Sequence, residues 1–480
     1  MIRSPLRVAL AYVLLVGGPL LALIAILRVK VSPAAAVAPS LPAAGHAAVA
    51  AAGLPQPIAV VLAVTVVVLA CRACGALFAR LGQPRVVGDM FAGIMLGPSV
   101  LGLVAPGVSQ ALFSPVTVRS LEAVSQLGLI LFMFLVGLRL APTELKSQGH
   151  VAVLTSHVSI AVPFVAGAVL ALYLYPRLSP DNVSFATFAL FIGTAMSVTA
   201  FPVLARILTE RHLLETRLGV TAIACAAVDD VTSWCLLAYI VAVVRSGGGL
   251  LAAAWTVGGL IAFVLAMIVV VRPVLRRIEP RFSREGATGE GTLALVLPLI
   301  LAAALVTDLM GAHALFGPFL LGAVMPKEPR LVRDLSVRLE TVVVVLLLPL
   351  FFALTGLRTR IGFLDTPQMW LTAAAILGVA VFGKLGGSAA AAWLSGLPGK
   401  EAVLLGVLMN TRGLVELVVL NVGLDAGVIS PPLFSMLVFM ALATTAMTTP
   451  LIDVIGRSRL PDIYRVWREA VTRGAGVAGQ

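Results

Sequence analysis

The sequence predicts an all-α polytopic membrane protein with thirteen or fourteen transmembrane helices. Hydrophobic residues make up 60% of the 480 residues and charged residues only 12%, about half of their usual share in a soluble domain. The mean hydropathy is +1.06. The apolar runs are long, continuous and rich in Leu and Ala, without the two-residue alternation of barrel strands. These observations exclude a water-soluble enzyme and a fibrous or disordered chain.

Fourteen apolar runs approach the length of about 20 residues that a helix needs to cross a bilayer core. The first run has a second interpretation as a cleaved signal sequence, because Arg3 and Arg7 precede it and an Ala/Pro-rich stretch follows it. Cleavage would leave thirteen spans. The predicted spans lie at 8–28, 58–80, 86–104, 121–139, 151–175, 185–208, 215–244, 251–272, 292–309, 312–326, 339–357, 370–395, 401–424 and 433–455.

The distribution of Lys and Arg predicts the direction of the spans. If the N-terminus is inside, the inner loops and ends carry 24 basic residues and the outer loops carry 7. Such a bias places both ends in the cytoplasm if the first helix is retained, and it predicts a multi-pass protein of the cell inner (plasma) membrane. The net charge of +12 is scattered between apolar runs, so no nucleic-acid partner is expected.

The expected organisation has three parts. Residues 1–57 form an N-terminal helix and an external linker, residues 58–455 form the membrane domain, and residues 456–480 form a short basic cytoplasmic tail. We expect no soluble regulatory domain in the chain and no cofactor. The sequence contains neither a zinc-protease H-E-x-x-H motif nor a P-loop, and we expect that the protein is not an enzyme.

Three patterns recur seven spans apart and indicate an inverted-topology repeat. A Gly-Pro pair occurs at Gly97 and again at Gly317, and a Leu-x-Gly-Leu-Arg run ends at Arg139 and again at Arg358. The third pair is formed by two spans that polar residues interrupt. Because seven is odd, paired spans cross the membrane in opposite directions, as in many secondary transporters.

The two interrupted spans predict broken helices that cross near mid-membrane. The sixth span contains Ser197, Thr199 and Pro202, and the thirteenth contains Asn410 and Thr411 before Gly413. Proline removes a backbone donor and disturbs the preceding turn, although a simple kink is the alternative for Pro202 alone. Two broken helices that meet from opposite sides present their ends where an ion can bind.

Asp229 and Asp230 are the most informative charges within the predicted spans. They lie near the middle of the seventh span, where a charge costs at least about 2.5–3.5 kcal/mol on insertion scales. Two adjacent carboxylates cannot both stay ionised cheaply in a low dielectric, so one must hold a proton, bind a cation or pair with a base. Competition of this kind suits proton-coupled cation transport. The alternative is an acid hydrogen-bonded for packing.

Three further charges within the spans are candidates for the same site. Lys384 is at mid-membrane and can pair with one of the two aspartates or, as a buried base, release a proton. A purely structural salt bridge is its alternative. Arg412 and Glu416 are spaced i,i+4 and suit a pair on one helix face. The alternative is a pair that only neutralises charge at the break.

Eight motifs together resemble the second family of monovalent cation:proton antiporters, within the sodium/hydrogen exchanger superfamily. This branch includes plant cation/proton exchangers and bacterial potassium-efflux antiporters. The motifs are LGQPRVVG at 81–88, GPSVLG at 97–102, FLVGL at 134–138, TAMSVTAFPVLAR at 194–206, AAVDDVT at 226–232, HALFG at 313–317, FGK at 382–384 and MNTRGLVE at 409–416.

The resemblance implies the sodium/proton antiporter fold and a homodimer. Each protomer would have a dimerisation part and a six-helix core that moves as an elevator. It implies that Asp230 carries the ion or the protons and is the ligand of the transported metal cation. Asp229 would pair with Lys384, with Thr199 and Thr411 close by. Asp89 departs mildly from the family, in which Glu is common at that position.

These observations predict a secondary transporter that exchanges K⁺ or Na⁺ for H⁺ across the bilayer by alternating access. One alternative is a sodium-coupled symporter for an organic anion on a similar fold, which would need basic groups facing the cavity. Another is a cation channel or ion sensor, which would need no titratable pair at mid-membrane.

Overall fold

The computed structural model describes residues 16–29, 31, 55–139, 149–181, 183–211, 213, 216–245, 250–282, 289–310 and 313–457. Within these residues the chain is helical between its turns and loops and contains no strand, which confirms the all-α prediction. A helix lies within or across each of the predicted spans. Nine of the described helical segments are long and apolar enough to cross a membrane. The chain is therefore a multi-pass membrane protein. The tail beyond Arg457 lies outside the described residues.

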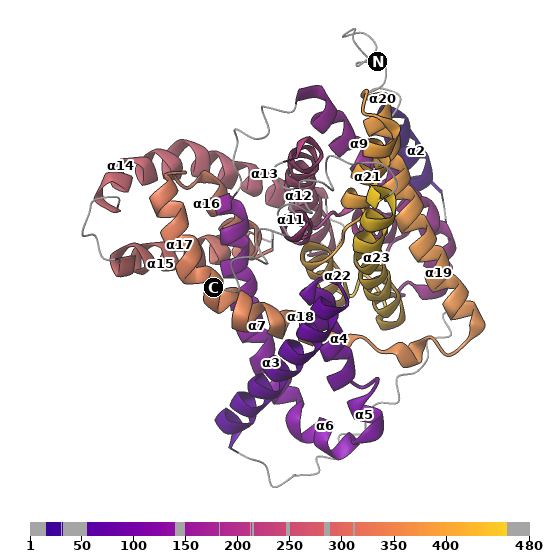
Figure 1. Ribbon diagram of the computed structural model, residues 1–480, viewed down its shortest axis with the longest axis horizontal. Helices are drawn as coiled ribbons and strands as arrows, with labels where there is room; N and C mark the ends of the chain where they lie inside the picture. The colour runs from indigo at the N-terminus through magenta and orange to yellow at the C-terminus, as the bar shows by residue number, and fades with distance from the viewer. Residues whose placement is uncertain are drawn as a thin grey trace.

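One group of helices, here called the flanking bundle, occupies the left and lower parts of Figure 1. Its members pack mainly on one another. The π-helical segment η3 (Val343–Leu347) joins two of them into one long element. The flanking bundle contains α3 (Gln56–Arg80), α4 (Arg85–Leu96), α7 (Pro115–Arg139), α15 (Gly289–Leu309), α16 (Phe316–Val324), α17 (Pro329–Val342) and α18 (Leu348–Arg358).

The second group, here called the crossing bundle, lies on the right of Figure 1 and contains both broken helices. Its helices come from two stretches of chain that are far apart in sequence. The first stretch supplies α9 (Gly149–Leu178), α10 (Phe185–Ser197), α11 (Phe201–Glu210) and α12 (Arg217–Arg245). The second supplies α19 (Pro367–Val381), η5 (Phe382–Gly386), α20 (Gly387–Leu394), α21 (Gly399–Met409), α22 (Leu414–Asp425) and α23 (Pro431–Arg457).

Peripheral helices complete the described chain. The N-terminal α2 (Gly18–Leu27) packs on α9. Three segments lead from α12 to α15: α13 (Leu250–Ala266), η2 (Met267–Val271) and α14 (Arg272–Phe282). Helix α13 contacts α12, whereas η2 and α14 contact α16 and α15 of the flanking bundle. The expected division into a dimerisation part and a moving core stays a prediction.

Glycines bring the paired helices of the flanking bundle into backbone contact. A Cβ on Gly322 of α16 would stand 2.2 Å from the carbonyl oxygen of Phe134 on α7. A Cβ on Gly93 of α4 would stand 2.1 Å from the carbonyl oxygen of Ala353 on α18. Only glycine permits such an approach. The inverted repeat inferred from the sequence relates α4 to α16 and α7 to α18, so the α4–α18 contact and the α16–α7 contact are equivalent under that repeat.

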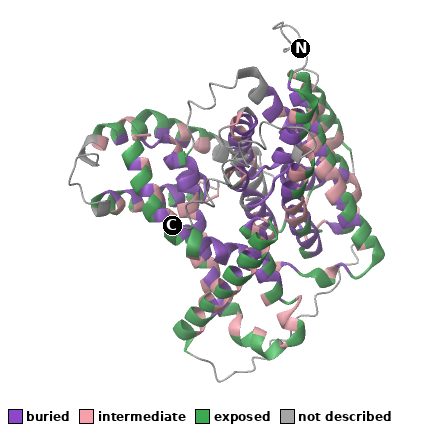
Figure 2. Ribbon diagram, viewed as in Figure 1, coloured by how far each residue is buried: buried purple, intermediate pink, exposed green. Residues whose placement is uncertain are grey.

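Burial separates the interior of the crossing bundle from the periphery. Figure 2 shows buried residues concentrated in the crossing bundle and exposed residues along α3, α14 and α15. Large apolar side chains remain exposed on the outer helices, including Val269 at 67% and Phe382 at 81%. An apolar surface of this kind is stable against lipid and not against water. The polar site described next therefore lies inside a bundle whose outer faces are apolar.

Candidate functional site

The two broken helices cross at their interruptions, as predicted. Helix α10 ends at Ser197 and α11 begins at Phe201, while α21 ends at Met409 and α22 begins at Leu414. The amide of Ala200 donates to the carbonyl of Thr411 at 3.0 Å. The hydroxyl of Thr199 lies 3.1 Å from the carbonyl of Met409. The unwound segments therefore satisfy part of each other's backbone, which a bilayer core requires of any non-helical stretch.

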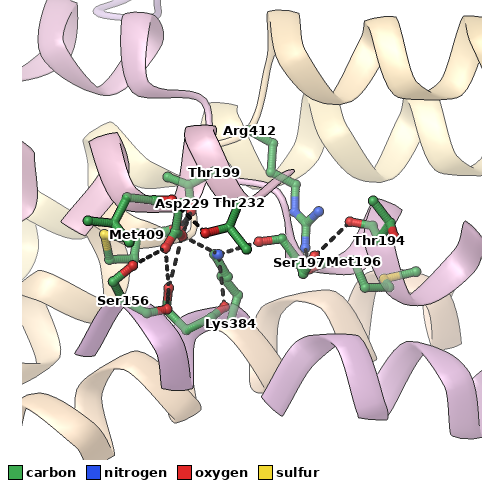
Figure 3. A network of polar contacts seen from close by, with 12 residues as sticks. Ser156, Thr194, Met196, Ser197, Thr199, Asp229, Thr232, Lys384, Met409 and Arg412 are labelled. Carbon is green, nitrogen blue, oxygen red and sulfur yellow. Dashed lines mark hydrogen bonds and ion pairs between the residues drawn. The ribbon is translucent and has the colours of Figure 1, made fainter. Parts of the chain in front are cut away.

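Lys384 and Asp229 form a fully buried ion pair beside this crossing (Figure 3). The Lys384 Nζ lies 2.8 Å from Oδ2 of Asp229, which is the pairing that the family resemblance implied. The ammonium also donates to the carbonyls of Ser159, at 2.9 Å, and Ser197. All three of its donors are thus used. Lys384 lies in the π-helical segment η5, and a wider turn of this kind often occurs at functional sites.

Three hydroxyl groups complete the surroundings of the Asp229 carboxylate. Ser156 of α9 donates to Oδ1 at 2.8 Å, and Thr199 lies 2.8 Å from Oδ2. Ser159 of α9 lies within 3.1 Å of both oxygens. The carboxylate is therefore held by α9, by the α10–α11 break and by η5. Sequence reasoning missed both serines, although their i,i+3 spacing on one apolar helix was a usable signal.

Arg412 occupies the other side of the crossing. Its Nη1 donates to the carbonyl of Ala195 at 2.7 Å and its Nη2 to the carbonyl of Met196 at 2.6 Å. Nη1 also lies 3.0 Å from Oε1 of Glu416, so the expected i,i+4 pair is present and fully buried. Oε2 of Glu416 has no hydrogen-bond partner among the described residues.

The C-terminal end of α10 is contacted by two basic side chains. Arg412 covers the carbonyls of Ala195 and Met196, and Lys384 covers that of Ser197. The C-terminal end of a helix carries a partial negative charge, which nearby cations stabilise. The corresponding end of α21 is met instead by the Thr199 hydroxyl at Met409. The two half-helix ends therefore differ in charge.

The remaining predicted residues take different positions. The hydroxyl of Thr411 lies 3.5 Å from the hydroxyl of Thr448 on α23. The side-chain nitrogen Nδ2 of Asn410 lies 3.9 Å from the sulfur of Met447. Pro202 is the second residue of α11, and its side chain lies outside the described residues, as does that of Asp230. The backbone of α12 continues as a helix through residue 230.

The described part of the site contains no cluster of metal-ligating side chains. Among the described residues there is no group of three or more His, Cys, Asp or Glu side chains that could hold a metal ion. The four charged groups at the crossing consist of two acids and two bases in pairs. The acid and the base of each pair cancel, so these four groups carry no net charge when all are ionised.

Two cavities lie along the boundary between the bundles. A cavity of about 770 Å³ is lined by α11 of the crossing bundle and by α3, α4, α7 and α18 of the flanking bundle. A smaller cavity of about 320 Å³ is lined by α22 of the crossing bundle and by α7 and α18. Each cavity therefore lies beside the second half of one broken helix.

Comparison with known proteins identifies the family. Residues 66–454 match the model of the transmembrane sodium/hydrogen exchanger family. The chain belongs to the sodium/hydrogen exchanger family. It is similar to the Na⁺/H⁺ antiporter NhaS4 of Synechocystis sp., with 44% identity over 390 residues that cover 81% of this chain and 95% of the relative.

Other relatives of this exchanger chain are longer. Cation/H⁺ antiporter 17 of Arabidopsis thaliana is 40% identical over 82% of the chain and 48% of its own length. K⁺/H⁺ antiporter 1 of Saccharomyces cerevisiae is 33% identical over 83% of the chain and 46% of its own length. The chain thus spans about half the length of these plant and yeast relatives.

A solved structure confirms the fold of this exchanger chain. The sodium proton antiporter MjNhaP1 of Methanocaldococcus jannaschii superimposes with a TM-score of 0.61, covering 83% of this chain and 97% of that one at 14% identity. At this identity the likeness concerns the fold alone.

Proposed function

We propose that this exchanger moves a monovalent cation, K⁺ or Na⁺, against H⁺ by alternating access, and is a transporter rather than an enzyme. Its relatives are named as Na⁺/H⁺, K⁺/H⁺ and cation/H⁺ antiporters. The observation that carries the proposal is the buried Lys384–Asp229 pair at the crossing of two broken helices. A mid-membrane crossing of this kind is typical of ion-coupled transporters.

Asp230 is proposed as the carboxylate that takes the cation and the protons in turn. Asp229 is engaged by Lys384 and by three hydroxyl groups, and Glu416 is engaged by Arg412. Asp230, the next residue of α12, is the acid that the sequence adds to these neutral pairs. A cation and a proton competing for one carboxylate give exchange, because each must leave before the other binds. Flux is therefore expected to fall at low pH.

Alternating access is proposed to occur by an elevator movement of the crossing bundle against the flanking bundle. Both broken helices and both buried ion pairs lie within the crossing bundle, so the bundle can carry the site without dismantling it. The two boundary cavities lie beside the halves α11 and α22. We propose further that the protein works as a homodimer in the plasma membrane, with both ends cytoplasmic and the larger cavity facing inward.

The geometry disfavours the organic-anion symporter. An organic anion needs a basic group that is accessible and not already paired, whereas the three donors of Lys384 are used by protein acceptors. Arg412 is fully buried and already paired with Glu416, although its Nε has no partner among the described residues. A channel would carry cations without moving protons. Proton coupling therefore separates the proposal from the channel alternative.

The test is cation-driven proton flux in everted membrane vesicles, followed by a pH-sensitive dye. K⁺, Na⁺, Li⁺ and Rb⁺ are added in turn, because the relatives are named for different cations. Wild type should dequench the dye, Asp230→Asn should not, and the exposed-loop control Asp365→Asn should behave as wild type. Flux by Asp230→Asn at the wild-type rate would defeat the assignment, and cation flux without proton flux would favour a channel.

A further inference from the structure

Arg358 joins the two bundles at the smaller cavity. It is the last residue of α18, and its guanidinium reaches two other helices. Nη2 lies 2.6 Å from Oε1 of Glu122 on α7 in the flanking bundle. Nη1 lies 2.9 Å from Oδ1 of Asp425 and 3.0 Å from Oδ1 of Asn421, both on α22 in the crossing bundle. One side chain therefore ties a broken-helix half to the flanking bundle.

A second polar contact crosses the boundary at the same place. The side-chain nitrogen Nδ2 of Asn421 donates to the hydroxyl of Thr355 on α18 at 3.0 Å. Two other ion pairs each lie within one bundle: Arg139 with Glu340 in the flanking bundle, and Lys384 with Asp229 in the crossing bundle. The Arg358–Asp425 pair differs because it must break if the bundles move apart.

The position of Asp425 has no local explanation. It is the last residue of α22, and an acid at the C-terminal end of a helix opposes the partial charge of that end. The helix alone would favour a base there. Arg358 is the described group that compensates this acid.

The Arg358–Asp425 ion pair is also weak enough to open repeatedly. The side chains of Arg358 and Asp425 are 26% and 61% exposed, so water replaces their contact at little cost. The fully buried Lys384–Asp229 pair has no such replacement. A contact that closes a boundary and exchanges readily with water has the properties of a latch.

The inverted repeat supports this role. Arg139 and Arg358 end the same Leu-x-Gly-Leu-Arg run on equivalent helices. Each pairs with a Glu of the flanking bundle, Glu340 and Glu122 respectively. Of the two arginines, Arg358 is the one with a described ion pair to the crossing bundle, and it also lines the smaller of the two cavities.

We propose that Arg358 is a positioning residue that latches α22 to α7 and α18 and so holds the two bundles together at the smaller cavity. The inference rests on the alternating access proposed above. When the crossing bundle moves to open this side, Arg358 releases Asp425 and Asn421 and keeps Glu122. The latch thereby sets the balance between the two open conformations without touching the transported ion.

The test measures both sides of the boundary at once. In a background in which Cys71, Cys74, Cys225 and Cys235 are replaced by Ala, Gln126→Cys reports on the smaller cavity and Ala76→Cys on the larger one. Membrane-impermeant thiol reagents are applied to vesicles of each orientation. Asp425→Asn should speed labelling at 126 by roughly three- to tenfold and slow labelling at 76.

The matched control is Glu122→Gln, which removes the other acid on the same guanidinium without touching α22. It should leave the labelling ratio close to that of wild type, and the conservative Asp425→Glu should restore it. Unchanged rates in Asp425→Asn, or faster labelling at both positions, would overturn the latch. Proton flux in the wild-type protein is scored separately: its absence would refute the proposed function, whereas the labelling comparison judges the latch.

Discussion

Replacement of Lys384 by Met tests how the charges of the site are balanced. The substitution keeps most of the side-chain volume and removes the ammonium. Asp229 would keep its hydroxyl donors but lose its counter-charge in a fully buried position. The carbonyls of Ser159 and Ser197 would lose a donor as well. Removing one partner of a buried ion pair costs about 3–5 kcal/mol, so we expect the free energy of unfolding to fall by that amount.

The double variant Asp229→Asn/Lys384→Met separates charge from packing. It leaves neutral hydrogen bonds, each worth about 0.5–1.5 kcal/mol, and no uncompensated charge. We therefore expect it to be more stable than Lys384→Met alone, with a coupling of about 2 kcal/mol in the double-mutant cycle. The order of the two variants in stability is a sharper test than the exact free energies.

Reversible unfolding by SDS in mixed micelles supplies the measurement. Arg139→Met is the matched control, because the Arg139–Glu340 side chains are 46% and 41% exposed and such pairs contribute only about 0–1 kcal/mol. If Lys384→Met cost no more than this control, or if the double variant were no more stable than the single one, the described charge balance would be wrong.

Three further predictions use the same preparations. Gly322→Ala should lower the free energy of unfolding by about 1–3 kcal/mol, because its Cβ would stand 2.2 Å from a carbonyl oxygen. The control Gly378→Ala has open space around it and should not lower the free energy of unfolding. Equal effects of the two substitutions would contradict the close packing at Gly322. Burial lowers the pKa of Lys327, in the loop after α16, from 10.5 to about 8. As the pH rises, the folded state loses the Lys327 proton at a lower pH than the unfolded state does, so wild type should gain stability relative to Lys327→Met between pH 8 and 10.5. A stability difference that does not depend on pH would refute the lowered pKa. Thr199→Val removes the hydroxyl shared by Asp229 and the α21 end and should raise the half-saturating cation concentration in the flux assay, while Thr444→Val, whose hydroxyl bonds only to its own helix among described partners, should leave it unchanged.

Sequence reasoning predicted the features that depend on composition and on rare residues. Long apolar runs gave the helices, and polar interruptions at 197–199 and 410–413 gave the breaks that the structure shows. Lys384 and Asp229 were recognisable because a charge within an apolar span needs a partner. The motifs at 226–232 and 382–384 then selected which aspartate takes the lysine, and the ion pair agrees with that selection.

Features that depend on packing between distant segments were not predictable. Ser156 and Ser159 look like ordinary polar residues of an apolar helix until α9 is placed beside α12. The carbonyls that receive Arg412 belong to the main chain and leave no mark in the sequence. The bridge from Arg358 to α22 likewise joins residues 67 positions apart, and neither residue stands out without the fold.

The way in which α10 ends has a consequence for how the protein is made. Its last three carbonyls are satisfied by Lys384 and Arg412, which the ribosome adds long after α10 has been synthesised. Until they arrive, the nascent helix has bare acceptors at its end, and hydrocarbon offers them no donor. The end of α10 therefore reaches its described hydrogen bonding only after the second repeat has been synthesised.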